Sequence, residues 1–257
     1  YIFALSFLGV NCNNRILPNT MLRATPFNPK DVRAILFDLG GTLLHLSYPF
    51  FYEQFQERYQ YALSEMRFFQ AVSCATEAMS QLVQQHQQTT DASRLPIFFE
   101  TLLTALDLPF ELSPDRSTFV QEVILAEHQR SNLWRYLLPD TEAVLKALQP
   151  TYRLAMISNS DGRAEALTIT HGLRPYLEFV LDSHYVGVEK PDAKIFLLAA
   201  EKLGLSPSEC VYVGDIYAID VLGARAAGMN AILLDRTKKM RTDCLVISTL
   251  SELLSFF

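Results

Sequence analysis

Hydrophobic and polar positions follow two patterns along this chain. Short apolar runs, each followed by a polar turn, occur near residue 35 and repeatedly after residue 150. Between most of these runs, apolar residues recur three or four positions apart, which is typical of amphipathic helices. The apolar runs predict strands at 33–37, 154–157, 179–182, 211–213, 231–234 and 246–247. The helical pattern predicts helices at 140–149, 165–171, 194–203 and 221–227.

Residues 50–132 contain no convincing strand and much helical periodicity. Phe51, Phe55 and Tyr59 lie one helical turn apart, and further helices are expected at 96–106 and 117–129. Strands that alternate with helices favour a largely parallel sheet covered on both faces. We therefore predict an α/β fold with a Rossmann-like parallel sheet core and an inserted all-helical cap domain. The predicted core comprises residues 31–48 and 133–257, and the predicted cap comprises residues 49–132.

Composition narrows the class of protein. The chain has 257 residues, 49% of them hydrophobic, and a net charge of −6. That balance argues against nucleic acid or an anionic membrane as a partner of the whole chain. The four cysteines are scattered without metal-ligand spacing, which favours a reducing, cytoplasmic location. Residues 1–30 are expected to be a disordered leader or a mis-set start, and a homodimer stays open.

Polar side chains follow several of the predicted strands. Asp38 comes directly after the first strand, and Ser158 and Asn159 follow the second. Asp215 follows the fourth, with Asp220 five residues further on. Open parallel sheets bind ligands at the carboxyl ends of their strands. We therefore expect these side chains to share one site.

The residue types at this edge suit phosphoryl transfer. Asp38 and Asp215 are hard oxygen ligands of the kind that Mg²⁺ prefers, and the backbone carbonyl of Gly40 could complete the protein's share. Lys190 supplies a positive charge for an anionic substrate and helps to keep Asp38 ionised. Ser158 and its neighbour Asn159 offer neutral donors to phosphoryl oxygens. The set predicts in-line transfer to a carboxylate nucleophile, through an aspartyl-phosphate.

Four ordered motifs resemble those of the haloacid dehalogenase-like hydrolase superfamily. The motifs are Asp38-Leu-Gly-Gly-Thr42, Ser158-Asn159, Lys190-Pro191 and Gly214-Asp215 with Asp220. The resemblance covers about residues 33–236, and the helical block directly after the first motif looks like the branch with a C1 cap. It implies an α/β hydrolase that uses Mg²⁺ on a small phosphorylated substrate.

The resemblance also implies roles for individual residues. Asp38 would be the nucleophile and a Mg²⁺ ligand, Asp215 a second ligand, and Lys190 the residue that stabilises charge. Thr42, Ser158, Asn159 and Lys190 would bind the phosphate group. Asp220 would orient Lys190 or a metal-bound water, or it would only cap the following helix.

One residue departs from the phosphatase pattern. Phosphatases of the family have a second aspartate two positions after the first, where this chain has Gly40. That aspartate is the general acid and base, which typically contributes about 10²–10⁴ in rate. The enzyme would then act on esters with easy leaving groups, use another residue such as His45, or turn over slowly.

Two other functions remain as alternatives. One is a catalytically impaired relative that binds phosphate ligands or a protein partner. The other is a metal-independent 2-haloacid dehalogenase, although Asp215 and Asp220 favour phosphoryl chemistry. Phosphonate cleavage is disfavoured because residues 50–132 contain no lysine for a Schiff base. The basic run at 236–241 predicts a solvated loop.

Overall fold

The computed structural model describes residues 27–85, 90–112, 115–237 and 243–257. The predicted leader lies almost wholly outside them. The described chain divides into two compact units, one formed by Leu46–Tyr136 and the other by residues 27–45 and 137–257. None of the described helices is long and apolar enough to cross a lipid bilayer.

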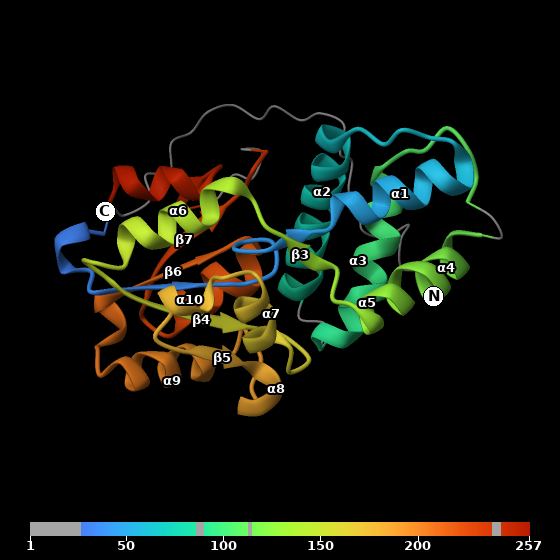
Figure 1. The fold of residues 1–257 in the computed structure, drawn as a ribbon. Coiled ribbons are helices and arrows are strands. Elements are labelled where there is room, and N and C mark those ends of the chain that lie inside the picture. The colour runs from blue at the N-terminus through green and yellow to red at the C-terminus, as the bar shows by residue number, and fades with distance from the viewer. Residues whose placement is uncertain (1–26, 86–89, 113–114, 238–242) are drawn as a thin grey trace. The chain divides into compact units, whose positions relative to one another are not determined.

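The larger unit is built on a six-stranded sheet (Figure 1). The strands lie in the order β5-β4-β1-β6-β7-β8, and each neighbouring pair is parallel. They are β1 (Ala34–Phe37), β4 (Arg153–Ser158), β5 (Val180–Asp182), β6 (Cys210–Gly214), β7 (Asn230–Leu234) and β8 (Leu245–Ile247). The predicted Rossmann-like parallel sheet is confirmed.

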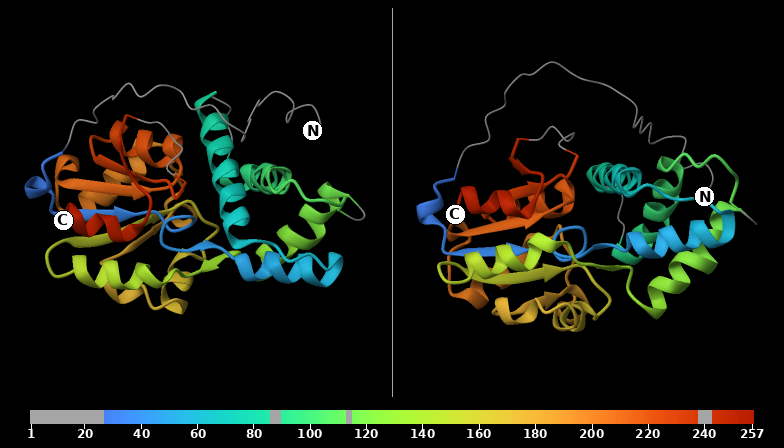
Figure 2. Two further views of the ribbon diagram at one scale, coloured as in Figure 1. Left: turned by 90° about the horizontal axis from the view of Figure 1, so that it is seen from above. Right: turned by 45° about the horizontal axis from the view of Figure 1, so that its top comes forward.

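Helices cover both faces of this sheet, as the views in Figure 2 show. Alternate residues of a strand point to opposite faces. Ile35 and Phe37 therefore join one apolar core with Leu145 of α6 (Pro139–Leu148), while Leu36 joins another with Phe196 of α9 (Ala193–Leu203). Burial on both faces explains why these strands are continuous apolar runs and do not alternate with polar residues.

The helices of this unit agree with the predicted periodicity, with local exceptions. The four predicted helices correspond to α6 (Pro139–Leu148), α7 (Ala164–Thr170), α9 (Ala193–Leu203) and α10 (Leu222–Ala226). The remaining helical segments are η1 (Pro29–Asp31), η3 (Arg174–Tyr176), α8 (Ser183–Val186), η4 (Pro207–Glu209), η5 (Tyr217–Val221) and η6 (Leu250–Ser255). The segment η5 is a π-helix, which the pattern of apolar residues does not predict.

The smaller unit is helical apart from one strand. It contains α1 (Tyr48–Tyr59), α2 (Glu65–Gln84), α3 (Asp91–Ala105), α4 (Arg116–Thr118), the π-helix η2 (Phe119–Leu125), α5 (Ala126–Arg130) and β3 (Trp134–Tyr136). Phe51, Phe55 and Phe68 are among its fully buried side chains. Helix α3 begins before the predicted residue 96 because the Thr90 side chain accepts a hydrogen bond from the Ser93 backbone.

Two short strands were not predicted. β2 (His45–Leu46) and β3 form a separate two-stranded sheet where the chain enters and leaves the helical unit. Both are too short to produce a clear alternating pattern. The cap boundaries at 49 and 132 stay a prediction.

Candidate active site

The candidate site lies at the carboxyl ends of three adjacent strands. Strands β4, β1 and β6 are neighbours in the sheet, so the residues that follow them are brought to one edge. Asp38 follows β1, and its backbone N–H donates to Val213 of β6 at 2.9 Å. Ser158 ends β4, and Asp215 follows β6. The topology therefore gathers the side chains that the sequence predicts to share a site.

Lys190 connects the acidic residues. Its side chain is only 2% exposed, and its Nζ donates to Asp38 Oδ1 at 2.6 Å, to Asp220 Oδ1 at 2.8 Å and to the Tyr212 hydroxyl at 2.8 Å. A lysine ammonium has three protons, and these contacts use all of them. Tyr212 in turn donates to the Ile157 carbonyl at 3.0 Å. Lys190 is thus held in one place among opposite charges.

Tyr212 is a site residue that the sequence analysis missed. It occupies the middle of an apolar strand, where its ring packs against Phe196 and its hydroxyl contacts Lys190. The sequence feature that could have identified Tyr212 is a tyrosine within a strand expected to be fully buried, because a buried phenol usually has a hydrogen-bond partner.

Asp220 belongs to the π-helix η5. Its Oδ1 binds Lys190 and its Oδ2 accepts from the Ile216 backbone N–H at 2.9 Å. A Cβ at Gly214 would lie 2.3 Å from the Asp220 Cγ, so only glycine leaves room for this carboxylate. The structure therefore gives Asp220 two contacts, one that orients Lys190 and one that closes the turn before the helical segment.

Asn159 contacts the backbone of Lys190 from both ends of its amide. Its Nδ2 donates to the Lys190 carbonyl at 2.9 Å, and its Oδ1 accepts from the Lys190 N–H at 2.8 Å. These bonds use the oxygen and one of the two N–H donors of the amide that is predicted to bind phosphate. The arrangement favours a positioning role, in which Asn159 holds the loop that carries Lys190.

Two buried oxygens at this edge have no hydrogen-bond partner. Thr42 is fully buried and its Oγ1 is unpartnered, and so is Oδ1 of Asp215. The Ser158 hydroxyl makes only a long contact, 3.4 Å, to the Asn159 carbonyl. Because buried polar atoms are rarely left unpaired, these oxygens indicate a ligand at this edge of the sheet.

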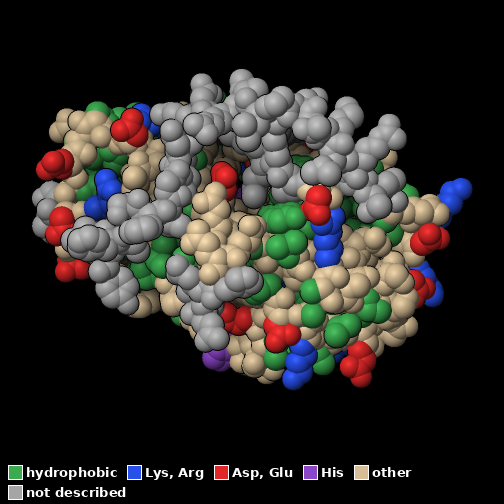
Figure 3. All heavy atoms as spheres, turned by 180° about the vertical axis from the view of Figure 1, so that it is seen from behind, with side chains coloured by type: hydrophobic (Ala, Val, Ile, Leu, Met, Phe, Trp, Pro, Cys, Tyr) green, Lys and Arg blue, Asp and Glu red, His purple; other side chains and the backbone are tan. Residues whose placement is uncertain are grey.

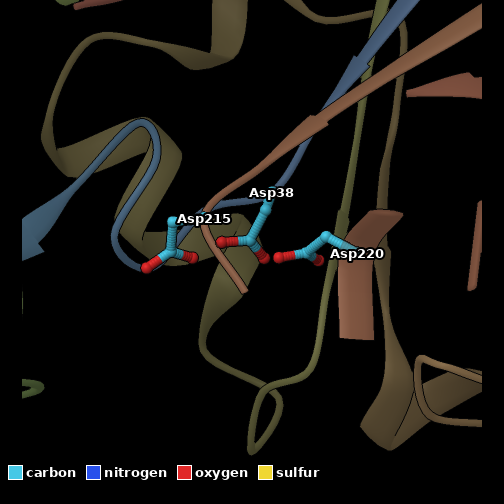
Figure 4. Close-up of side chains that lie close together, drawn as sticks. All are labelled: Asp38, Asp215 and Asp220. Carbon is cyan, nitrogen blue, oxygen red and sulfur yellow. The ribbon is translucent and has the colours of Figure 1, made fainter. Parts of the chain in front are cut away.

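The carboxylates of Asp38, Asp215 and Asp220 converge, with Asp38 between the other two (Figure 4). One oxygen from each lies within 4.8 Å of the others. Burial raises the pKa of Asp38 to about 6, although the charge of Lys190 opposes this shift. Burial, and next the charge of Asp38, raise the pKa of Asp215 well above its usual range. A divalent cation between these oxygens would offset their repulsion, so the donor set fits Mg²⁺.

The loop after β1 lies against this cluster. Gly41 has a φ of 96°, and a Cβ there would lie 2.2 Å from Asp215 Oδ2. Its neighbour Gly40 has no positive φ and forms an isolated bridge with Leu44. The backbone conformation therefore allows a side chain at Gly40 and disfavours one at Gly41.

His45 lies in a different environment from the one a general acid requires. It is 3% exposed, and Nη2 of Arg236 donates to its Nε2 at 2.8 Å. Burial, and then the charge of Arg236, lower the pKa of His45 to about 3. A neutral imidazole has no readily released proton, so this geometry weighs against His45 as the replacement acid.

The prediction of a solvated loop is wrong for Arg236, which is partly buried, and residues 238–242 lie outside the described chain.

Comparisons with known proteins all place this chain among hydrolases of one class. The sequence model of the haloacid dehalogenase-like hydrolase family matches residues 32–228. Over 99 residues the chain is 37% identical to haloacid dehalogenase-like hydrolase domain-containing protein 3 of Mus musculus, which covers 38% of this chain and 39% of that protein. A phosphoserine phosphatase of Thermus thermophilus is 35% identical over 127 residues, 48% of this chain and 49% of the relative. Each of these two matches spans less than half of the relative's length.

A solved structure shares the fold. The HAD-hydrolase YfnB from Bacillus subtilis, bound to magnesium, has a TM-score of 0.62 at 18% identity and covers 87% of this chain and 97% of its own. The family match extends over well more than half of the chain and includes every residue of the converging cluster from Asp38 to Asp220. The chain therefore belongs to the haloacid dehalogenase-like hydrolase family.

Proposed function

We propose that this hydrolase is a Mg²⁺-dependent phosphatase that acts on a small phosphorylated metabolite. The observation that carries the proposal is the convergence of Asp38 and Asp215, which follow the adjacent strands β1 and β6, with Lys190 from the loop before α9. Relatives named phosphoserine phosphatase and glyceraldehyde 3-phosphate phosphatase support the same chemistry. In this mechanism Asp38 attacks phosphorus, the alcohol departs, and water then cleaves the aspartyl-phosphate.

Different residues of the chain have different roles in this mechanism. Lys190 binds Oδ1 of Asp38 and thereby fixes the orientation of the attacking carboxylate. The unpartnered Thr42 Oγ1 and the Ser158 hydroxyl donate to phosphoryl oxygens. Asp38, Asp215 and the Gly40 carbonyl would hold Mg²⁺, which neutralises negative charge on the phosphate when it is bound.

The direct test is hydrolysis of an aryl phosphate by the purified protein, with Mg²⁺ and with a chelator. We expect turnover that stops when the metal is removed and returns when Mg²⁺ is added back. Absence of hydrolysis in a folded protein that binds Mg²⁺ would favour the catalytically impaired relative. Halide release from a 2-haloacid without Mg²⁺ would instead establish the dehalogenase.

Asp215→Asn should have opposite effects on stability with and without metal. Without divalent cations the variant has a higher melting temperature than the wild type, by about 2–4 °C for each kcal/mol of repulsion removed. In Mg²⁺ the wild type has the higher melting temperature, because it gains a free energy of metal binding that the variant largely loses. Thermal unfolding in chelator and in Mg²⁺ measures both effects, beside Asp31→Asn as a control at the opposite end of β1. An equal stabilisation of Asp215→Asn and the wild type by Mg²⁺ would contradict the assignment of Asp215.

Gly40→Asp should restore general acid catalysis. The backbone at Gly40 has no positive φ, so it accepts a side chain. We expect alkyl phosphates, whose leaving groups need a proton, to be hydrolysed about 10²-fold faster, and aryl phosphates to change little. The ratio of kcat/KM for the two substrates is the measurement, and Gly41→Asp, at a strained and crowded position, is the control that should lose activity. An unchanged ratio would mean that the chain does not lack an acid.

Charges of both signs are mixed on one face of the part of the chain that the structure describes. On the face drawn in Figure 3, basic and acidic side chains of the described residues are interspersed. Among the described residues, that face lacks the basic patch that nucleic acid requires, and the absence of a nucleic-acid partner stays a prediction from the net charge of the chain. The cytoplasmic location and the homodimer stay predictions from the sequence.

A further inference from the structure

Arg236 is fixed at the same edge of the sheet as the acidic cluster. It follows Leu234 and Asp235 at the carboxyl end of β7, and β7 pairs with β6, whose end carries Asp215. The Asp235 carboxylate accepts from the Thr237 backbone N–H at 3.0 Å and from its hydroxyl at 2.7 Å, which forms a tight turn around Arg236. The guanidinium is held from the other side by buried His45, at 2.8 Å. The turn therefore positions the Arg236 backbone, and His45 positions its guanidinium.

The partners of this guanidinium do not balance its charge. Its Nε is buried and has no hydrogen-bond partner, and its Nη2 binds a neutral imidazole. Asp140 and Asp215 act on it electrostatically, and neither of them forms an ion pair with Arg236 among those found in the described chain. A partly buried cation with an unpaired donor is unfavourable in the free protein. The unpartnered donor of this cation is suited to binding an anion.

The charge balance of the proposed active site favours a second cationic side chain when a phosphate ester is bound. Asp38, Asp215 and Asp220 contribute three negative charges, and Lys190 contributes one positive charge. One divalent cation would neutralise the remainder. A phosphate monoester then adds about two negative charges, while all three protons of Lys190 already bind protein oxygens. Arg236 is a nearby cation whose donors are not used in this way, and a guanidinium matches the geometry of oxyanions.

We propose that Arg236 is a substrate-binding residue that contacts an oxyanion of the bound phosphate ester, and that His45 is its positioning residue. The inference rests on the proposed function and extends it to substrate recognition. The oxyanion is either the phosphoryl group itself or a carboxylate on the leaving group. His45, with Nε2 accepting from the guanidinium, aims the remaining donors of Arg236 at that group.

The experiment measures binding, so it does not depend on turnover. Methylphosphonate and phosphonoacetate share a phosphonate group, and only the second also has a carboxylate. Their dissociation constants are measured by calorimetry in Mg²⁺ for the wild type, Arg236→Gln and Arg236→Lys. Arg33→Gln removes the same charge at the opposite end of β1, where the arginine is exposed, and serves as the matched control.

We expect Arg236→Gln to weaken binding by about tenfold to a hundredfold, Arg236→Lys to weaken it less, and Arg33→Gln to leave it unchanged. Equal weakening for both probes identifies the phosphoryl group as the contact, and weakening for phosphonoacetate alone identifies the carboxylate. Equal affinities of Arg236→Gln and the wild type for both probes would overturn the inference, as would a wild type that binds neither probe.

Two further readouts separate a binding role from a structural one. Arg236→Gln should melt no lower than the wild type, because it removes a poorly compensated charge. His45→Gln retains an acceptor for the guanidinium and should bind the probes better than His45→Leu. A wild type that binds the probes and fails to hydrolyse aryl phosphate would disprove the proposed phosphatase and leave this inference standing. If the wild type hydrolyses aryl phosphate and Arg236→Gln binds both probes as tightly as the wild type, the proposed phosphatase stands and this inference is disproved.

Discussion

Asp38→Asn is expected to lower kcat for an aryl phosphate by about 10⁴-fold or more, the scale seen when a catalytic nucleophile is removed. The amide has nearly the same shape as the carboxylate, but it is a poor nucleophile and carries no negative charge toward a metal. Lys190 keeps its bonds to Asp220 and Tyr212 in the variant, so the fold should persist. The measurement is steady-state kinetics in saturating Mg²⁺, with circular dichroism to confirm folding.

The matched control is Asp31→Asn. Asp31 is exposed and precedes β1, so the two variants remove the same charge from opposite ends of one strand. The control should keep wild-type kcat. Rapid quenching of the wild type should also trap one phosphoryl group on the peptide that contains Asp38, and Asp38→Asn should trap none. Substantial hydrolysis by Asp38→Asn would show that another group attacks phosphorus.

The core fold could be predicted because its strands are buried on both faces. A continuous apolar run such as Ile35-Leu36-Phe37 cannot be placed at a surface, and the polar residue after each run marks where the strand ends. Parallel strands then bring those end residues together, whatever their separation in sequence. The meeting of Asp38 with Asp215 followed from this rule alone.

What the sequence could not predict depends on particular side-chain partners. The sequence predicts that Asn159 binds phosphate, and it does not reveal that the amide binds the backbone of Lys190, a residue far along the chain. Tyr212 looked like an ordinary strand residue, because only the packed structure shows that its hydroxyl reaches Lys190. Arg236 stood in a basic run typical of a solvated loop. Each of these contacts joins segments whose distance in space is set by the fold.

The π-helix η5 is a second kind of feature that periodicity does not reveal. Its wider turn is a local change in hydrogen bonding, and the pattern of apolar residues around it still resembles an α-helix. Its consequence is specific, since Asp220 lies within it and binds Lys190. π-helical turns frequently occur at functional sites, and this one lies beside the proposed nucleophile's partner.

Lys190→Met is expected to destabilise the folded protein by about 3–5 kcal/mol, because two buried carboxylates lose their shared cation. The methionine side chain has a similar length and carries no charge, so the loss is mainly electrostatic. Chemical denaturation gives the free energy of unfolding. Lys194→Met, at an exposed position on α9, is the control and should change that free energy by less than about 0.5 kcal/mol.

The pH dependence of this loss follows from Asp38, one of the two carboxyl groups that Lys190 contacts. Burial already raises the pKa of Asp38 to about 6 in the wild type, and removal of Lys190 should raise that pKa further. An acid whose pKa is higher in the folded state than in the unfolded state destabilises the fold at high pH, and the penalty disappears as the acid becomes protonated. The destabilisation by Lys190→Met should therefore be larger at about pH 8 than at about pH 5. Adding Asp220→Asn should recover part of it, because one of the unpaired carboxylates is then neutral. A loss that is independent of pH and of Asp220 would mean that Lys190 stabilises the fold through packing and not through charge.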